Sequence, residues 1–282
     1  MIFEETLFEN GKQISYVRYG NWTDNVILFF HGFTGSKRFI PEIEKNHEVC
    51  ILSFDRPGIG NSSIKEYYKI EDFLYSINEF LANKNINCIH LIGHSAGGYF
   101  AQVFLEMYPE RVKSLSLLNS IIPLNCLETK ELLNKQWKII KFLTLHNKYI
   151  SKLYFRIMAS KIKKNYEKYF QINIKTLSSC ERQFMYDNYD FIKQAIVSAV
   201  ANNGLGVFYD AYALCQKKDL IEIKNNIPVH IWWGTSDTMI PLNFINYLEK
   251  KYKTSETHII ENIGHMLYLI EWENILQEIL NL

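Results

Sequence analysis

In its first 120 residues the chain alternates short apolar runs with segments whose apolar residues recur at helical spacing. A continuous apolar run is typical of a strand that is buried on both faces. Strands are predicted at residues 12–19, 25–30, 48–54, 87–92 and 112–118. Helical periodicity predicts helices at residues 69–83 and 96–108. Buried strands that alternate with helices predict an α/β fold with a mostly parallel central sheet flanked by helices.

The alternation stops after residue 120, and residues 121–216 contain long, aromatic-rich, helix-like stretches without a clear strand. Strand patterns return at residues 229–233 and 257–260, with helix-like segments at residues 241–252 and 266–282. We therefore expect one α/β core, made of residues 1–120 and 217–282. An all-helical cap, residues 121–216, is expected to interrupt it.

The charges of the chain nearly cancel, with 31 Lys and Arg against 30 Asp and Glu. This balance argues against bulk nucleic-acid binding, which needs clustered cations. It hides an asymmetry, because residues 121–210 carry 14 basic and 7 acidic side chains while the rest carries 17 and 23. A basic cap on an acidic core leaves room for a local electrostatic role at the mouth of a site.

Several classes of protein are disfavoured by the sequence. No apolar run is long enough for a membrane span, and the acidic N-terminus does not resemble a secretory signal. The five cysteines are scattered without a CxxC or Cys/His cluster, which suggests neither a disulfide framework nor a zinc site. These features predict a reduced, cytoplasmic protein without stable membrane insertion.

The sharpest chemical signal is Gly93-His94-Ser95-Ala96-Gly97, a G-x-S-x-G between a predicted strand and a predicted helix. A serine at the apex of so tight a turn is held in a strained conformation with its hydroxyl exposed. The residues two before and two after it must be nearly free of side chain, and Gly93 and Gly97 meet that need. The alternative is an ordinary helix cap at Ser95.

The sequence resembles the α/β-hydrolase superfamily, in the esterase- and lipase-like branch with a serine nucleophile and a helical cap. Four motifs carry the resemblance over residues 1–120 and 217–282: HGFTGS at 31–36, DRPGIGNSS at 55–63, GHSAGG at 93–98, and the pair WWGTSDTMIP at 232–241 and NIGHMLYL at 262–269. The family's chain order implies Ser95 as nucleophile, Asp237 as acid and His265 as base. It also implies an oxyanion hole made by the amides of Phe33 and Ala96.

The choice of His265 as base and Asp237 as acid can also be compared with the other candidates in the chain. His265 alone among eight histidines combines the family's motif with a Gly-His loop near the C-terminus. His31 and His94 fall in other motifs. Three histidines lie in predicted strands, where packing or pairing is expected: His90, His230 and His258. His47 and His146 look like surface or cap residues. Some members place the acid after the preceding strand, but residues 118–120 offer no carboxylate.

The resemblance implies hydrolysis of carboxylic esters of small to medium acyl groups through an acyl-enzyme, with no metal or organic cofactor and with a small-molecule substrate. A carbon–carbon bond hydrolase of ring-fission products and a non-catalytic ligand-binding member of the fold are the alternatives. Ser95 disfavours the dehalogenases and epoxide hydrolases that carry an aspartate at this turn, and HGFTGS departs from the HGGPG loop of proline iminopeptidases. A nucleotide-binding reading of residues 58–63 is weak, because the third glycine is missing. The sequence leaves the oligomeric state open.

Two features of the predicted cap have a functional and a structural interpretation. Its aromatic residues could line an apolar pocket, or they could simply pack the helices together: Tyr149, Tyr154, Phe155, Tyr166, Tyr169, Phe170, Phe184, Tyr186 and Tyr189. The basic run 161–169 could steer anionic substrates or touch acidic lipid, or it could be a solvated helix face.

Overall fold

The computed structural model describes residues 2–9, 11–41, 48–126, 129, 133–216, 220 and 227–281. Its centre is an eight-stranded sheet in the order β1-β2-β4-β3-β5-β6-β7-β8. The strands are Ile2–Glu9, Lys12–Tyr19, Val26–Phe30, Cys50–Phe54, Ile89–His94, Val112–Leu118, Val229–Gly234 and Ser255–Ile260, numbered β1 to β8 in chain order. Neighbouring strands are parallel from β4 through β3, β5, β6 and β7 to β8. The β1–β2 and β2–β4 pairs are antiparallel.

Helices cover both faces of this sheet, as buried parallel strands require. The neighbouring residues Phe29 and Phe30 of β3 point to opposite faces. Phe30 packs against Phe100 of helix α2 (Ala96–Met107), with ring centroids 6.2 Å apart. Phe29 packs instead against Tyr268 of α11 (Leu267–Ile270) and Trp272 of α12 (Trp272–Leu280). Helices α1 (Ile70–Asn83) and α10 (Phe244–Lys251) complete the layers beside the sheet.

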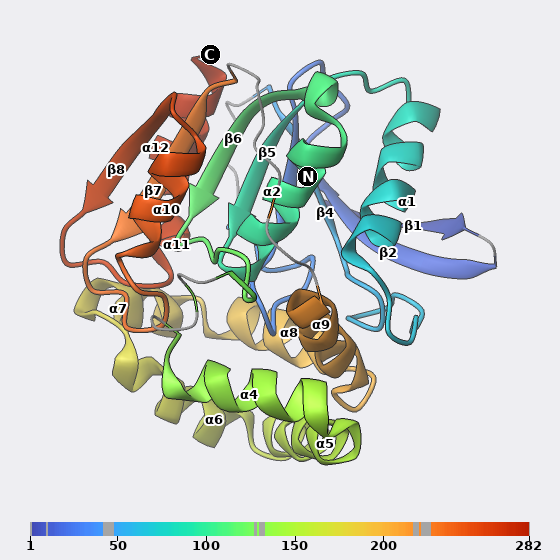
Figure 1. Cartoon of the computed structure of the whole chain (residues 1–282), viewed down its shortest axis with the longest axis vertical. Helices are drawn as coiled ribbons and strands as arrows, with labels where there is room; N and C mark the ends of the chain where they lie inside the picture. Colours follow the sequence, from blue (N-terminus) through green and yellow to red (C-terminus); the bar gives the residue numbers. More distant parts are fainter. Residues whose placement is uncertain are drawn as a thin grey trace.

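The remaining helices form a separate layer at the carboxyl ends of the strands (Figure 1). We call this the helical layer; it comprises α4 (Lys135–His146), α5 (Lys148–Lys164), α6 (Tyr166–Asn173), α7 (Ser179–Asp187), α8 (Tyr189–Ala199) and α9 (Leu205–Gln216). Loops that follow the strands contact it directly. The hydroxyl of Ser36, after β3, donates to the Ala195 carbonyl at 2.9 Å, and Asn202 donates to the Gly58 carbonyl at 2.9 Å.

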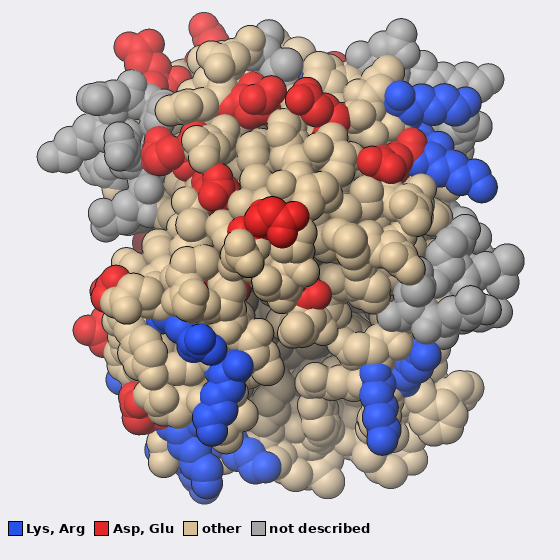
Figure 2. Space-filling model, turned by 90° about the vertical axis from the view of Figure 1, so that its left-hand side faces the viewer, with Lys and Arg blue, Asp and Glu red and all other residues tan. Residues whose placement is uncertain are grey.

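Charges separate between the two parts of the molecule. On the face in Figure 2, most acidic side chains lie over the sheet, and most basic side chains lie lower down, over the helical layer. This distribution agrees with the charge asymmetry read from the sequence. None of the described helices is both long and apolar enough to cross a bilayer.

The predicted strands and helices of the α/β part are confirmed within a few residues, with two corrections. Strand β1 was not predicted: its residues are mostly exposed or half-buried, so it has no continuous apolar run. The single closing helix expected at residues 266–282 is two helices, α11 and α12. They have different partners, since α11 lies against α7 while Trp272 of α12 packs on Phe29.

Candidate active site

Ser95 lies at the tight turn between β5 and α2, in a strained conformation with φ 54° and ψ −121°. Non-glycine residues rarely adopt a positive φ, so the surrounding packing must hold it there. A β-carbon on Gly97 would collide with the carbonyl oxygen of Phe30, and one on Gly93 would lie 2.5 Å from the Cα of Gly98. The two glycines are therefore required by close backbone approach, as the sequence predicts.

Asp237 and His265 face each other from the loops that follow β7 and β8. The Nδ1 of His265 lies 2.8 Å from Oδ2 of Asp237, and both side chains are almost fully buried. The amides of Met239 and Ile240 donate to the other carboxylate oxygen at 2.7 and 3.0 Å. Burial alone would raise the pKa of Asp237, but the charge of His265 and these hydrogen bonds hold it below its ordinary value. An ionised Asp237 accepts a hydrogen bond from Nδ1–H of His265, which leaves Nε2 of His265 as an acceptor.

Asn119, directly after β6, is a partner of Asp237 that the sequence analysis did not identify. Its Nδ2 donates to Oδ2 of Asp237 at 2.7 Å, and the residue itself has φ 43°. It lies at the alternative acid position considered above, where it supplies an amide donor instead of a carboxylate. The only signal in the sequence was its place after a buried strand.

His94 connects the Ser95 turn to the His265 loop. Its Nε2 lies 2.9 Å from the carbonyl oxygen of His265, and the two imidazole centroids are 4.8 Å apart. Ser95 is the next residue along the chain. Within the described residues the Ser95 hydroxyl has no hydrogen-bond partner.

The loop 31–33 passes close to Ser95 and is held by Arg56. A β-carbon on Gly32 would lie 3.3 Å from that of Ser95, so glycine permits the approach. The Arg56 guanidinium donates to the carbonyls of His31 and Gly32 at 2.7 and 2.9 Å. In a trans peptide the N–H points opposite to the carbonyl. The amide of Phe33 is therefore directed away from Arg56.

Arg56 is in turn fixed by Asp210 of α9 in the helical layer. The two form a two-point ion pair, with nitrogen–oxygen distances of 2.8 and 2.9 Å, and the Tyr68 hydroxyl donates to the same carboxylate at 2.7 Å. Both charged side chains are essentially inaccessible to solvent. Arg56 therefore braces the loop next to Ser95, and Asp210 anchors Arg56 to the helical layer, a contact that the sequence did not show.

Glu181 of α7 is a second link between the helical layer and the site, also missed from the sequence. Its Oε1 accepts from the Met266 amide at 2.7 Å, and its Oε2 accepts from the Ser178 amide at 2.8 Å. Glu181 is 1% exposed, and Gly264 approaches it so closely that a β-carbon there would lie 2.8 Å from Oε2. The S-x-x-E pattern of 178–181 indicates a helix start. It does not indicate the contact with the loop of His265.

Comparison with known proteins identifies the family of this chain. Residues 25–271 match the family model described as alpha/beta hydrolase fold. The chain belongs to this family. Lipase 1 of Psychrobacter immobilis is 24% identical over 91% of this chain and 76% of its own length. A monoacylglycerol lipase of Xenopus laevis is 24% identical over 92% of this chain and 78% of its own. These relatives show that the protein is a hydrolase.

Solved structures agree with the fold of this hydrolase. The Bacillus megaterium epoxide hydrolase superposes with a TM-score of 0.73 at 18% identity, covering 99% of this chain and all of that one. An esterase from Exiguobacterium antarcticum has a TM-score of 0.67 at 18% identity, covering 96% of both chains. At such identities the likeness shows the fold alone.

The remaining histidines of the hydrolase lie in other environments. Burial, with the nearby His265 charge, lowers the pKa of His94 to about 3, and burial with the Arg56 charge lowers that of His31. His90 contacts the Ser114 hydroxyl at 2.8 Å inside the sheet, and His146 packs on Phe142 in α4. His47 lies outside the described residues.

Most of the aromatic residues in the helical layer pack its helices together. Five of them form one contact cluster across α6, α7 and α8: Tyr166, Tyr169, Phe170, Tyr186 and Tyr189. Tyr149 is 89% exposed and therefore lines no pocket. Phe155 differs, because it lies against Phe33 with ring centroids 6.1 Å apart, and Trp137 of α4 lies 5.0 Å from the same ring. Packing the helices together is thus the main role of the five clustered residues.

Proposed function

We propose that this hydrolase cleaves carboxylic esters of small to medium acyl groups through an acyl-enzyme on Ser95. His265 removes the Ser95 proton, Ser95 attacks the carbonyl carbon, and the alcohol leaves with a proton from His265. His265 then activates water to release the acid. Asp237 holds the imidazole in the required tautomer and stabilises its charged form. The buried contact between His265 and Asp237, beside the strained Ser95 turn, is the observation that carries the proposal.

The amides of Phe33 and Ala96 are the proposed oxyanion donors. Ala96 begins α2, so its N–H is among those that an α-helix leaves unpaired. Because Arg56 donates to the Gly32 carbonyl, the Phe33 amide of the same peptide is directed away from Arg56, as described above. Preorganised donors of this kind are each worth about 3–4 kcal/mol of transition-state stabilisation.

We further propose that residues 121–216 act as a cap over the core formed by residues 1–120 and 217–282. Trp137 and Phe155 of the helical layer contact Phe33, so an apolar wall stands next to the proposed oxyanion amide. Such a wall favours an apolar acyl or alcohol group over a charged one. The names of the lipase relatives agree with this substrate class.

Covalent labelling with a fluorophosphonate probe tests the nucleophile, and p-nitrophenyl esters of graded chain length test the reaction. We expect Ser95→Ala to abolish labelling and to reduce kcat at least 1,000-fold, about 4 kcal/mol. Ser236→Ala, next to Asp237 but without a catalytic role, is the matched control and should retain both. A wild type that is not labelled and cleaves no ester, but cleaves a ring-fission dienoate, would replace the proposal with carbon–carbon bond hydrolysis.

A further inference from the structure

Parallel pairing of β7 and β8, two and three strands along the sheet from β5, gathers three side chains of types that bind metals. His230 is paired with Glu256, and Trp232 with His258. Because side chains alternate between the two faces of a strand, all four residues lie on one face of the sheet. His230 is near the start of β7, whereas Asp237 follows its end. The cluster is therefore separate from the proposed catalytic groups.

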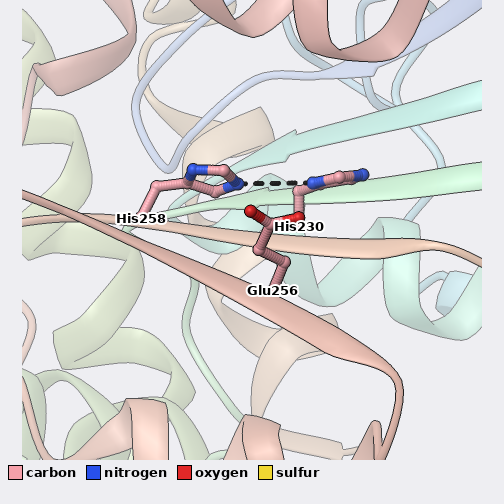
Figure 3. Close-up of side chains that lie close together, drawn as sticks. All are labelled: His230, Glu256 and His258. Atoms are coloured by element: carbon pink, nitrogen blue, oxygen red, sulfur yellow. Dashed lines mark hydrogen bonds between the residues drawn. The ribbon is translucent and has the colours of Figure 1, made fainter. Parts of the chain in front are cut away.

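The potential ligand atoms are close enough to share one ion. Nδ1 of His230 lies 3.3 Å from Nε2 of His258, and the Glu256 carboxylate lies next to both, with all three ligand atoms within 4.8 Å of one another (Figure 3). In a tetrahedral zinc site with bonds of about 2.0–2.1 Å, two ligand nitrogens are about 3.3–3.4 Å apart. No other group of three His, Cys, Asp or Glu in the described part of the chain meets this spacing.

The surroundings hold the two imidazoles in place. The indole of Trp232 stacks on His258 with ring centroids 4.0 Å apart and an interplanar angle of 12°. His230 is 4% exposed, whereas Glu256 is exposed and free to approach an ion. Oε1 of Glu278 in α12 lies 3.9 Å from Nδ1 of His230 and adds a second carboxylate beside the cluster. Two imidazoles and two carboxylates together offer donors suited to a divalent cation.

We infer that His230, Glu256 and His258 form a binding site for one Zn²⁺ ion, with the fourth position open to water or to Glu278. Mixed imidazole and carboxylate donors suit zinc, whereas Ca²⁺ and Mg²⁺ require oxygen ligands throughout. Among the described strands, β8 is at the edge of the sheet and pairs only with β7. The ion would cross-link this edge strand to its neighbour, and the loops of Asp237 and His265 follow these same two strands.

Zinc would replace the contact between the two imidazoles. Without metal, the N–H of one ring donates a hydrogen bond to the nitrogen of the other. With metal, both of these nitrogens donate lone pairs to the ion, and each ring keeps its proton on its other nitrogen, so no net proton is released from neutral imidazoles.

The test is zinc uptake by full-length protein first stripped with a chelator. We expect one Zn²⁺ per chain by elemental analysis, a higher Tm with zinc, and an absorption spectrum typical of tetrahedral coordination when Co²⁺ replaces it. His258→Ala and Glu256→Gln should each weaken zinc binding at least tenfold in competition with a chromogenic chelator. Glu256 is exposed, so its variant keeps the test decisive even if His258→Ala does not fold.

Two further variants separate this site from others. His265→Ala removes the proposed base, and His146→Ala removes a histidine of the helical layer; both should bind zinc like the wild type. The absence of stoichiometric uptake at micromolar zinc would overturn the inference. Uptake that Glu256→Gln leaves unchanged, or that His265→Ala abolishes, would overturn it as well. None of these outcomes depends on ester hydrolysis.

Discussion

The backbone amide of Met266 donates a hydrogen bond of 2.7 Å to Oε1 of Glu181, across 85 residues of sequence. Met266 directly follows His265, so a side chain of the helical layer holds the loop that carries the proposed base. The second oxygen of Glu181 closes the cap of its own helix through the Ser178 amide. One buried carboxyl group thus fixes the start of α7 and the His265 loop together.

Replacing Glu181 with glutamine is expected to impair positioning of the base. The amide side chain has a single acceptor oxygen, so either Met266 N–H or Ser178 N–H loses its partner. We expect kcat to fall about tenfold, or about 1.4 kcal/mol, with KM little changed. Steady-state kinetics on a p-nitrophenyl ester measure both.

Ser178→Ala is the control for Glu181, because it removes the capping hydroxyl without touching the His265 loop. It should cost about 1 kcal/mol in the free energy of unfolding and leave kcat unchanged. Equal losses of stability and unchanged kcat in both variants would show that Glu181 acts only as a helix cap.

Asp210→Asn is expected to destabilise the protein strongly. The change leaves the Arg56 guanidinium buried without its counter-charge, which typically costs about 3–5 kcal/mol. Urea denaturation measures the free energy of unfolding. Lys65 and Asp72 form an exposed pair at 3.4 Å, so Lys65→Met should change that energy by no more than about 1 kcal/mol. A similar small effect for Asp210→Asn would contradict the anchoring role of the buried pair.

Acid should destabilise the fold through its buried neutral histidines. Burial, with the Lys113 charge, lowers the pKa of His90 to about 4, against about 6.5 in an unfolded chain. Between these values the unfolded chain binds the proton and the folded chain does not. The free energy of unfolding therefore falls as pH falls from 6.5 to 4, by at most about 1.4 kcal/mol per pH unit for each such group.

His90→Gln should make this dependence on pH less steep, because the variant cannot take up that proton in the unfolded state. The measurement is urea denaturation at several pH values between 4 and 7. Ser114→Ala removes the hydrogen bond to His90 but no titrating group. It should lower stability at every pH without changing the slope, and an unchanged slope in His90→Gln would refute the assignment.

Trp137→Ala is expected to alter the preference for acyl chain length. The indole packs on Phe33 beside the proposed oxyanion amide, so its removal opens space in the apolar wall. We expect kcat/KM for long-chain p-nitrophenyl esters to rise several-fold relative to the acetate. Tyr149→Ala, at a position of α5 that is 89% exposed, should leave the ratio unchanged. An unchanged ratio in Trp137→Ala would place the acyl group elsewhere.

The sequence was sufficient for features that depend on local pattern. Strands β3 to β8, helix α2 and the Ser95 turn follow from apolar runs and from glycines at fixed offsets. Such spacing predicts the strained φ of Ser95. It also predicts that a side chain at Gly97 would collide with neighbouring backbone. The motifs also singled out Asp237 and His265, which the structure brings within 2.8 Å of each other.

Only the tertiary structure revealed the contacts between distant segments. Nothing in the local sequence of Asn119 or Glu181 indicates their distant partners, yet they form hydrogen bonds with Asp237 and Met266 across 118 and 85 residues. His230, Glu256 and His258 form no spaced motif, because strand register, and not chain order, brings them together. Local patterns determine which elements form and which turns they require. The packing of those elements decides which polar side chains meet, since buried donors and acceptors must find partners wherever the fold brings them.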